Sequence, residues 1–179
     1  LLGTSHLFTR DVFCFWEDRG EVRMQLKPHA PGIRKFSEQA LTAKARTIIK
    51  SMRASKDSGK AVMFYSCSIP GQTATAIKVA DTFVRSLRER LDQVFIINPA
   101  EYFEPGMDGD DLMFMWEQVQ RSGLINIWRF QSMEDIEASF GLMGLKVPPV
   151  WSGKDATFST GCTKEMRIAL DMQRSHPEL

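Results

Sequence analysis

Two short apolar segments separated by an amphipathic helix pattern constrain this chain more than any other feature. Ala61–Tyr65 and Val94–Ile97 contain almost only apolar residues. Between them, apolar side chains recur every three or four positions, as in a helix with one buried face, at Ile77, Ala80, Val84, Leu87 and Leu91. Apolar strands that alternate with helices indicate a parallel sheet covered on both faces. We therefore predict an α/β core of the Rossmann-like (flavodoxin-like) type.

The rest of the chain continues this alternation of helices and strands. Residues 110–120 have a helical pattern, and 124–128 form a third apolar run. The sequence Ser132-Met133-Glu134-Asp135 has the form of a capping box and predicts a short helix that extends to Leu142. A last helix is expected from about Gly161 to Gln173.

The N-terminal third of the sequence differs from this core. Asp11–Leu26 is typical of a β-hairpin, and the pattern from Ile33 to about Met52 predicts an amphipathic helix. The small polar stretch Ala54–Gly59 is interpreted as a linker. We therefore expect an N-terminal extension over residues 1–59 and a Rossmann-like core over residues 60–179.

Charge and composition restrict the classes of function. The 179 residues carry a net charge of +1, which makes a nucleic-acid partner unlikely. Residues 1–59 contain 11 Lys or Arg against 6 Asp or Glu, and residues 60–179 contain 12 against 16, so the extension is basic and the core is acidic. No apolar run approaches a membrane span, and three scattered cysteines suit neither a disulfide framework nor a zinc site. We expect a cytoplasmic protein with no membrane partner, no cofactor and no metal. Because the chain starts at Leu1 rather than Met, we also expect it to be processed or trimmed.

The segment between the first strand and its helix is a candidate anion-binding loop. Residues 66–73 read Ser-Cys-Ser-Ile-Pro-Gly-Gln-Thr. In a doubly wound fold, ligands bind beyond the carboxyl ends of the strands, where a helix N-terminus offers free amides. The segment lacks the Gly-Lys-Ser/Thr of a Walker A loop and the spacing of a dinucleotide loop. A tight turn without a ligand would look the same, so both interpretations remain open.

A carboxylate near the start of the last helix is the second candidate feature. Glu165 follows Ser159 and Gly161 and precedes an apolar run. From this position it can face the same cleft as the first loop and act as a nucleophile or as the partner of a developing cation. The alternative is that Glu165 only complements the dipole of its helix.

Together these two segments resemble the nucleoside 2-deoxyribosyltransferase superfamily, in particular its 2′-deoxynucleoside 5′-phosphate N-hydrolases. That family has an apolar strand that leads into a Gly-Ser-Ile-x-Gly loop, and residues 67–71 read Cys-Ser-Ile-Pro-Gly. The family also has a Ser-x-Gly-x-x-x-Glu turn at a later helix, which residues 159–165 match. The resemblance covers about residues 60–175.

The resemblance implies cleavage of the N-glycosidic bond of a nucleotide or nucleoside. It gives Glu165 the role of attacking or stabilising the anomeric carbon as the base departs. Ser159 and Gly161 would contact a 5′-phosphate, and the first loop would line the nucleotide pocket through Ser68, Ile69 and Gly71. The family's first-strand Tyr falls at Phe64, so the adjacent Tyr65 is expected in the pocket instead. Relatives form their sites at a homodimer interface, which makes a homodimer a possible state of this chain.

Two acidic positions of the family are replaced in this sequence. Trp116 stands where relatives carry an Asp, so its neighbour Glu117 is the candidate second catalytic carboxylate. Leu124 stands at the second Asp position. These replacements motivate an alternative, a non-catalytic module that senses nucleotides on the same fold. A third possibility is a TIR-like domain that cleaves NAD, since such domains also use a helix Glu.

Other residue clusters have simpler interpretations. Cys162 is expected to be a buried thiol rather than a nucleophile. Asp108, Asp110 and Asp111 are interpreted as a loop and helix N-cap rather than a cation site. Trp116 and Trp128 are expected in the core.

Overall fold

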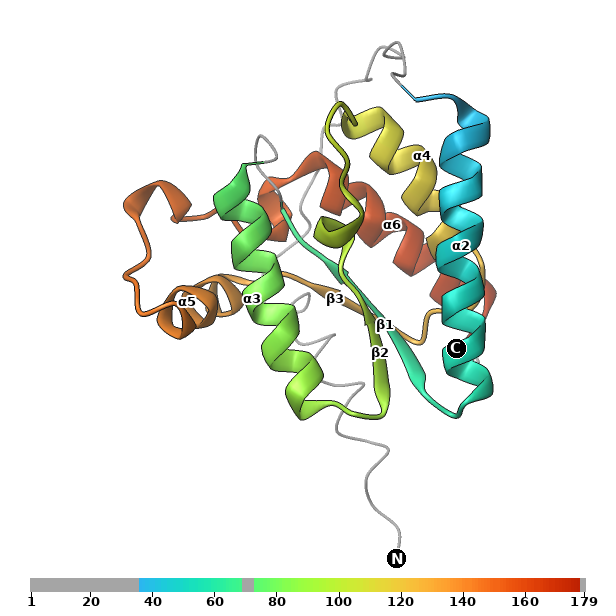
Figure 1. The fold of residues 1–179 in the computed structure, drawn as a ribbon, viewed down its shortest axis with the longest axis horizontal. Coiled ribbons are helices and arrows are strands. Elements are labelled where there is room, and N and C mark those ends of the chain that lie inside the picture. The colour runs from blue at the N-terminus through green and yellow to red at the C-terminus, as the bar shows by residue number, and fades with distance from the viewer. Residues whose placement is uncertain (1–35, 69–72, 178–179) are drawn as a thin grey trace, which may run out of the picture. The chain divides into compact units, whose positions relative to one another are not determined.

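A computed structural model describes residues 36–68 and 73–177 (Figure 1). Its described part is an α/β unit with a three-stranded parallel sheet. The strands are β1 (Ala61–Ser66), β2 (Val94–Ile97) and β3 (Ile127–Phe130), in the order β2-β1-β3. The apolar segments thus form the parallel sheet that the sequence predicts. The predicted hairpin over residues 11–26 lies outside the described residues.

Helices cover both faces of this sheet, as predicted. On one side lie α2 (Glu38–Asp57), α4 (Gly109–Gln120) and α6 (Thr160–Ser175), which share a hydrophobic cluster with the strands. On the other side lie α3 (Ala74–Arg90) and α5 (Met133–Leu142).

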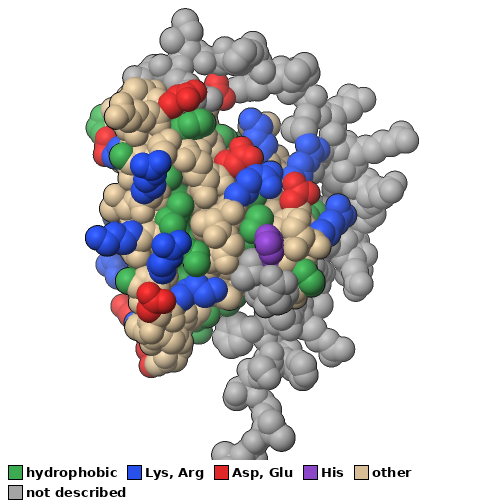
Figure 2. All heavy atoms as spheres, turned by 90° about the vertical axis from the view of Figure 1, so that its right-hand side faces the viewer, with side chains coloured by type: hydrophobic (Ala, Val, Ile, Leu, Met, Phe, Trp, Pro, Cys, Tyr) green, Lys and Arg blue, Asp and Glu red, His purple; other side chains and the backbone are tan. Residues whose placement is uncertain are grey.

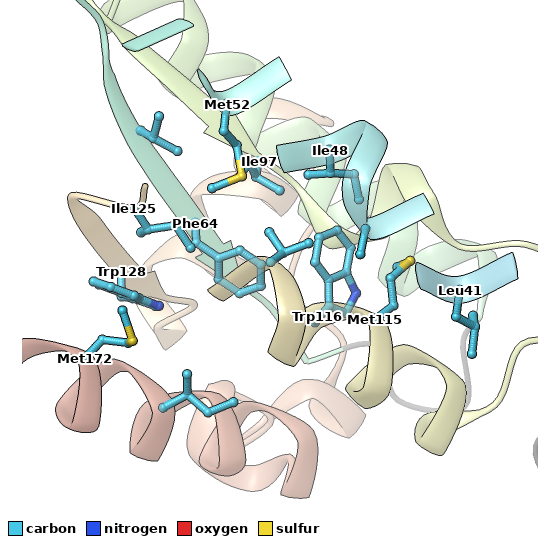
Figure 3. Packing of buried hydrophobic residues seen from close by; sticks show 14 of the residues in the cluster. Leu41, Ile48, Met52, Phe64, Ile97, Met115, Trp116, Ile125, Trp128 and Met172 are labelled. Carbon is cyan, nitrogen blue, oxygen red and sulfur yellow. The ribbon is translucent and has the colours of Figure 1, made fainter. Parts of the chain in front are cut away.

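Alternation along β1 divides the core between the two faces. Val62 and Phe64 belong to the cluster of α2, α4 and α6, whereas Met63 and Tyr65 pack on the α3 side. Figure 3 shows Phe64 beside Trp116 of α4, and their ring centroids lie 5.5 Å apart. Trp116 and Trp128 are 2% and 9% exposed, which confirms that both are core residues.

The first described helix is longer than predicted. The sequence predicts a linker over Ala54–Gly59, but α2 continues through Asp57. Within this helix the small hydroxyl residues donate to the carbonyl four residues earlier: Thr47 to Ala43, Ser51 to Thr47 and Ser55 to Ser51. The helix ends at Ser58, and Gly59 adopts φ +85°. The boundary expected at residue 59 falls in the turn between α2 and β1.

The third strand is displaced from its predicted position. The apolar run 124–128 predicts a strand there, but β3 begins at Ile127, paired with Met63, and ends at Phe130. Asn126 holds the entry to the strand, because its backbone N donates to the Val62 carbonyl and its side chain accepts from the Val62 N. Arg129 remains in the strand because Asp135 neutralises it across a 2.6 Å contact.

The helix starts follow the capping chemistry of the sequence. Ser132 and Asp135 form the predicted capping box of α5. Asp108 and Asp111 form a second one at α4, which confirms the acidic cluster as a helix cap. The outer face of α2 is basic, with Arg46, Lys50 and Arg53 exposed, and Figure 2 shows Lys and Arg side chains gathered over this side of the protein. None of the helices in the described ranges has an apolar stretch that could cross a bilayer.

Candidate functional site

The strand order places a candidate site beyond the carboxyl ends of β1 and β3. The chain passes from β1 through α3 to β2 on one side, and then through α4 to β3 on the other. Parallel sheets bind ligands in the crevice where the connections diverge in this way. Here the exits of the two strands are held together, because the Gln131 N donates to the Ser66 carbonyl at 2.8 Å.

Glu165 approaches this strand end from α6. Ser159 caps that helix by accepting a hydrogen bond from the Cys162 N at 3.3 Å. Glu165 lies in the second turn and is 6% exposed. Its Oε2 accepts a hydrogen bond from Ser66 Oγ at 2.5 Å, and Ser66, the last residue of β1, is fully buried. The carboxylate is therefore anchored to the central strand, which a group that only complements a helix dipole would not require.

The surroundings of Glu165 favour its neutral form. Burial raises the pKa of Glu165 to about 7, against an opposing effect of the Ser66 hydroxyl and the Gln120 side chain. Gln120 comes from the end of α4 and is fully buried. Within the described residues, neither polar atom of its carboxamide makes a hydrogen bond of normal geometry. Near neutral pH both forms of Glu165 are populated, as acid–base chemistry requires.

Two thiols lie next to this carboxylate. Burial, followed by the charge of Glu165, raises the pKa of Cys162 to about 12. Burial also raises the pKa of Cys67, with Cys162 and Glu165 adding to the effect. Both thiols are therefore neutral at physiological pH and unsuited to nucleophilic attack. The expectation of a buried Cys162 is confirmed, since it is 3% exposed.

The structure gathers only part of the predicted site. Ser68 is buried, with 3% exposure, two residues beyond Ser66. Ile69 and Gly71 lie outside the described residues. Ser159 and Gly161 form the first turn of the helix that carries Glu165. The segments of both motifs therefore converge on the end of β1.

Glu117 is not brought to Glu165. Its side chain retains 51% exposure on α4, where it forms an ion pair with Arg121 at 2.8 Å. Arg121 also approaches Asp171 of α6, at 3.7 Å. The second predicted carboxylate therefore belongs to a surface ion-pair group. The buried neighbour of Glu165 from the same helix is Gln120.

Tyr65 lies on the opposite face of the sheet from Glu165. It is fully buried in the cluster packed against α3. Its hydroxyl donates to Asp135 Oδ2 at 3.3 Å, and Arg129 Nη2 donates to Asp135 Oδ1 at 2.6 Å. Burial raises the pKa of Asp135, and Arg129 provides the main opposing effect. Tyr65, Asp135 and Arg129 thus form a polar group beside the ends of β1 and β3, on the face of the sheet opposite Glu165.

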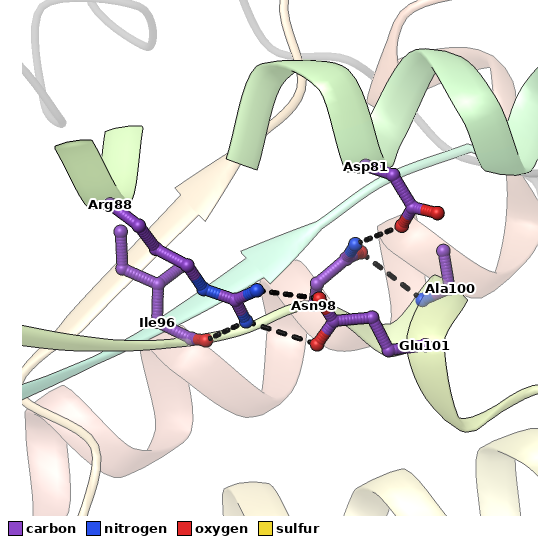
Figure 4. A network of polar contacts seen from close by, with 6 residues as sticks. All are labelled: Asp81, Arg88, Ile96, Asn98, Ala100 and Glu101. Carbon is purple, nitrogen blue, oxygen red and sulfur yellow. Dashed lines mark hydrogen bonds and ion pairs between the residues drawn. The ribbon is translucent and has the colours of Figure 1, made fainter. Parts of the chain in front are cut away.

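A further polar network closes the exit of β2 (Figure 4). Asn98 Nδ2 donates to Asp81 Oδ1 at 2.6 Å, and Asn98 Oδ1 accepts from the Ala100 N at 3.2 Å. Nearby, Arg88 bridges Glu101 and the Ile96 carbonyl. Burial raises the pKa of Asp81. The sequence analysis did not identify Asn98 or Gln131, although each directly follows a strand, which is a signal that could have found them.

Within the described ranges, no group of three or more His, Cys, Asp or Glu side chains is arranged to hold a metal ion. A scan against protein-family models, a search of curated proteins and a search of solved structures each found no match. The function of the protein must therefore be inferred from its own residues.

Proposed function

We propose that the protein cleaves the N-glycosidic bond of a nucleotide or nucleoside, with Glu165 as its catalytic carboxylate. The observation that carries this proposal is the buried contact of 2.5 Å between Glu165 and Ser66 at the carboxyl end of the central strand. The order β2-β1-β3 is also that of the first strands of flavodoxin-like sheets, the fold that we propose for the core. The resemblance of residues 159–165 to the family's Ser-x-Gly-x-x-x-Glu turn supports the same chemistry.

The step can be written from the properties of Glu165. The bond between the anomeric carbon and the base nitrogen breaks, and its electron pair leaves with the base, which takes up a proton. The ionised carboxylate stabilises the positive charge that develops on the anomeric carbon until water or a second base bonds to that carbon and loses a proton to solvent. Alternatively, the carboxylate itself forms a bond to the carbon, which water or a second base then replaces. Ser66 holds the attacking oxygen in place and favours its ionised form.

A second candidate is a module that binds nucleotides without turnover. It is favoured by the position of Glu117, because the only second carboxylate that the sequence analysis predicted is on the surface and paired with Arg121. The residue before it, Trp116, is buried in the core. Glu117 could then not protonate a leaving base.

The test is a release assay with a matched control. The protein is incubated with nucleoside 5′-monophosphates, nucleosides and NAD, and free base or nicotinamide is separated by chromatography. We expect release from a nucleotide or nucleoside, at least about 100-fold slower in Glu165→Gln, with the exposed Glu137→Gln unchanged. Equal release by Glu165→Gln refutes the role of Glu165.

The other outcomes separate the alternatives. Thermal stabilisation by nucleotides without release supports the sensing module. Nicotinamide release from NAD alone indicates TIR-like activity. Neither binding nor release with any compound of the panel contradicts all three functions.

A further inference from the structure

Gln131 is a buried polar residue at the place where the strand order predicts a ligand. It directly follows β3, and its backbone N bonds to the carbonyl of Ser66 across the crevice between the two strands. The side chain is 2% exposed, yet in the part of the chain that the structure describes neither Nε2 nor Oε1 makes a hydrogen bond of normal geometry. Leaving a buried carboxamide without partners is costly, so such a group is retained where something other than stability requires it.

The neighbours of Gln131 bond mainly to one another. Asp135 accepts from Arg129, from the Tyr65 hydroxyl and from the Ser132 N. Burial raises the pKa of Tyr65 and a hydrogen-bond interaction with the Gln131 side chain lowers it, so these two side chains are neighbours, although no hydrogen bond of normal geometry joins them. A contact with one hydroxyl leaves most of the donor and acceptor capacity of the carboxamide available to a ligand.

Arg129 adds a second donor to the same side of the sheet. It precedes Gln131 by two residues in an extended segment, so both side chains point to the same face. Its guanidinium lies over the Phe83 ring, 5.3 Å from the ring centroid, and its Nε is buried without a partner in the described structure. The pair thus presents N–H donors from Arg129, and both the N–H donors and the carbonyl acceptor of Gln131.

Glu165 and Gln131 reach the crevice from opposite faces. Phe130 packs with Cys162 and Met166 on the α6 side, and the next residue therefore faces α3. A nucleotide beyond the strand ends can present its anomeric carbon to one face and its base to the other.

We infer that Gln131 is the specificity-determining residue for the base and, together with Arg129, selects bases that carry a ring carbonyl beside a ring N–H. The carbonyl accepts from the N–H donors, and the ring N–H donates to Gln131 Oε1. This inference rests on the proposed function, because it concerns the same crevice.

Two matched ligand pairs test the selection. Inosine and adenosine 5′-monophosphates share sugar and phosphate. The base of the first presents a carbonyl beside a ring N–H, and that of the second presents an amino group beside an unprotonated ring nitrogen. Uridine and cytidine 5′-monophosphates differ in the same way. Affinities are measured by calorimetry in Glu165→Gln, which prevents turnover, with and without Gln131→Met. We expect inosine and uridine monophosphates to bind at least about tenfold more tightly than their partners, and Gln131→Met to lower this preference at least about threefold, because Arg129 still donates to the carbonyl.

The stability of the same variant separates recognition from a structural role. Removing a buried carboxamide without partners should leave the Tm unchanged or raise it, whereas a structural Gln131 would lower it. A Tm decrease of more than about 5 °C, or an intact preference in Gln131→Met, overturns the inference. Gln131→Glu provides a second check: an ionised carboxylate still accepts from the ring N–H but no longer donates to the carbonyl, so the preference should weaken. An unchanged preference counts against the inference.

Failure of this inference can be told apart from failure of the proposed function. Base release that is indifferent to Gln131 overturns the role of Gln131 alone. Binding that depends on Gln131 without base release overturns the proposed catalysis alone. Absence of binding by all four nucleotides overturns both.

Discussion

Replacing Glu165 with Gln should stabilise the folded protein at high pH and have little effect near pH 4.5. Burial raises the pKa of this carboxyl from 4.5 to about 7. The folded state therefore holds the proton more tightly than the unfolded state, and the free energy of unfolding falls as pH rises between these two values. At about 1.4 kcal/mol per pKa unit, the penalty on the wild-type protein approaches about 3 kcal/mol above pH 7. Gln keeps the acceptor for Ser66 and carries no charge, so it removes this penalty.

Urea unfolding of both proteins at pH 5 and pH 8 measures the effect. Other acids with a raised pKa, such as the buried Asp135 and the half-buried Asp81, contribute equally to both proteins and cancel in the difference. The exposed Glu137→Gln is the matched control and should show no such pH dependence. If the stability difference between Glu165→Gln and wild type does not change with pH, the raised pKa assigned to the Glu165 carboxyl is wrong.

Three further predictions follow from the packing. Gly161→Ala should raise the free energy of unfolding by about 0.5 kcal/mol in a denaturant titration, because Ala favours a helix more than Gly does. A Cβ at this position meets Ser159 Oγ at 3.5 Å and Met113 Sδ at 3.9 Å, both ordinary contacts, so a loss of stability would contradict this packing. Trp116→Ala should cost about 4 kcal/mol by the same titration, because the indole is 2% exposed against Phe64 and Tyr102, and a loss below about 1 kcal/mol would show that it is not a core residue. In a Cys14→Ser background, Cys67 and Cys162 should react with a thiol reagent only upon unfolding, because both are buried with raised pKa values, and rapid labelling of the native protein would contradict this.

Local patterns in the sequence predict much of this fold. The apolar segments become β1 and β2, and the periodic segments become helices, because burial on both faces of a parallel sheet leaves little choice of residue. The errors arise where composition does not decide the local structure. The helix α2 includes Ser55, whose hydroxyl bonds to a carbonyl of the same helix, and β3 is displaced because Asn126 sets the pairing with Val62.

The site is predictable only in part for a related reason. The segments of Ser66 and Glu165 can be identified as motifs, but their contact joins residues 99 positions apart. Sequence alone also does not show that Tyr65 faces away from Glu165, or that Gln120 rather than Glu117 is its neighbour from α4. The side of a strand or helix on which a residue falls depends on register and packing, which only the folded structure specifies.

The most direct test of the account is the pH dependence of kcat/KM for base release from a nucleoside 5′-monophosphate. If ionised Glu165 is the catalytic group, kcat/KM should rise with pH through a limb near pH 7. In Ser66→Ala that limb should move to higher pH, because the Ser66 hydroxyl normally lowers the pKa of Glu165. A profile without a limb near pH 7, or a limb that Ser66→Ala does not move, would contradict the assignment of Glu165 as the catalytic carboxylate.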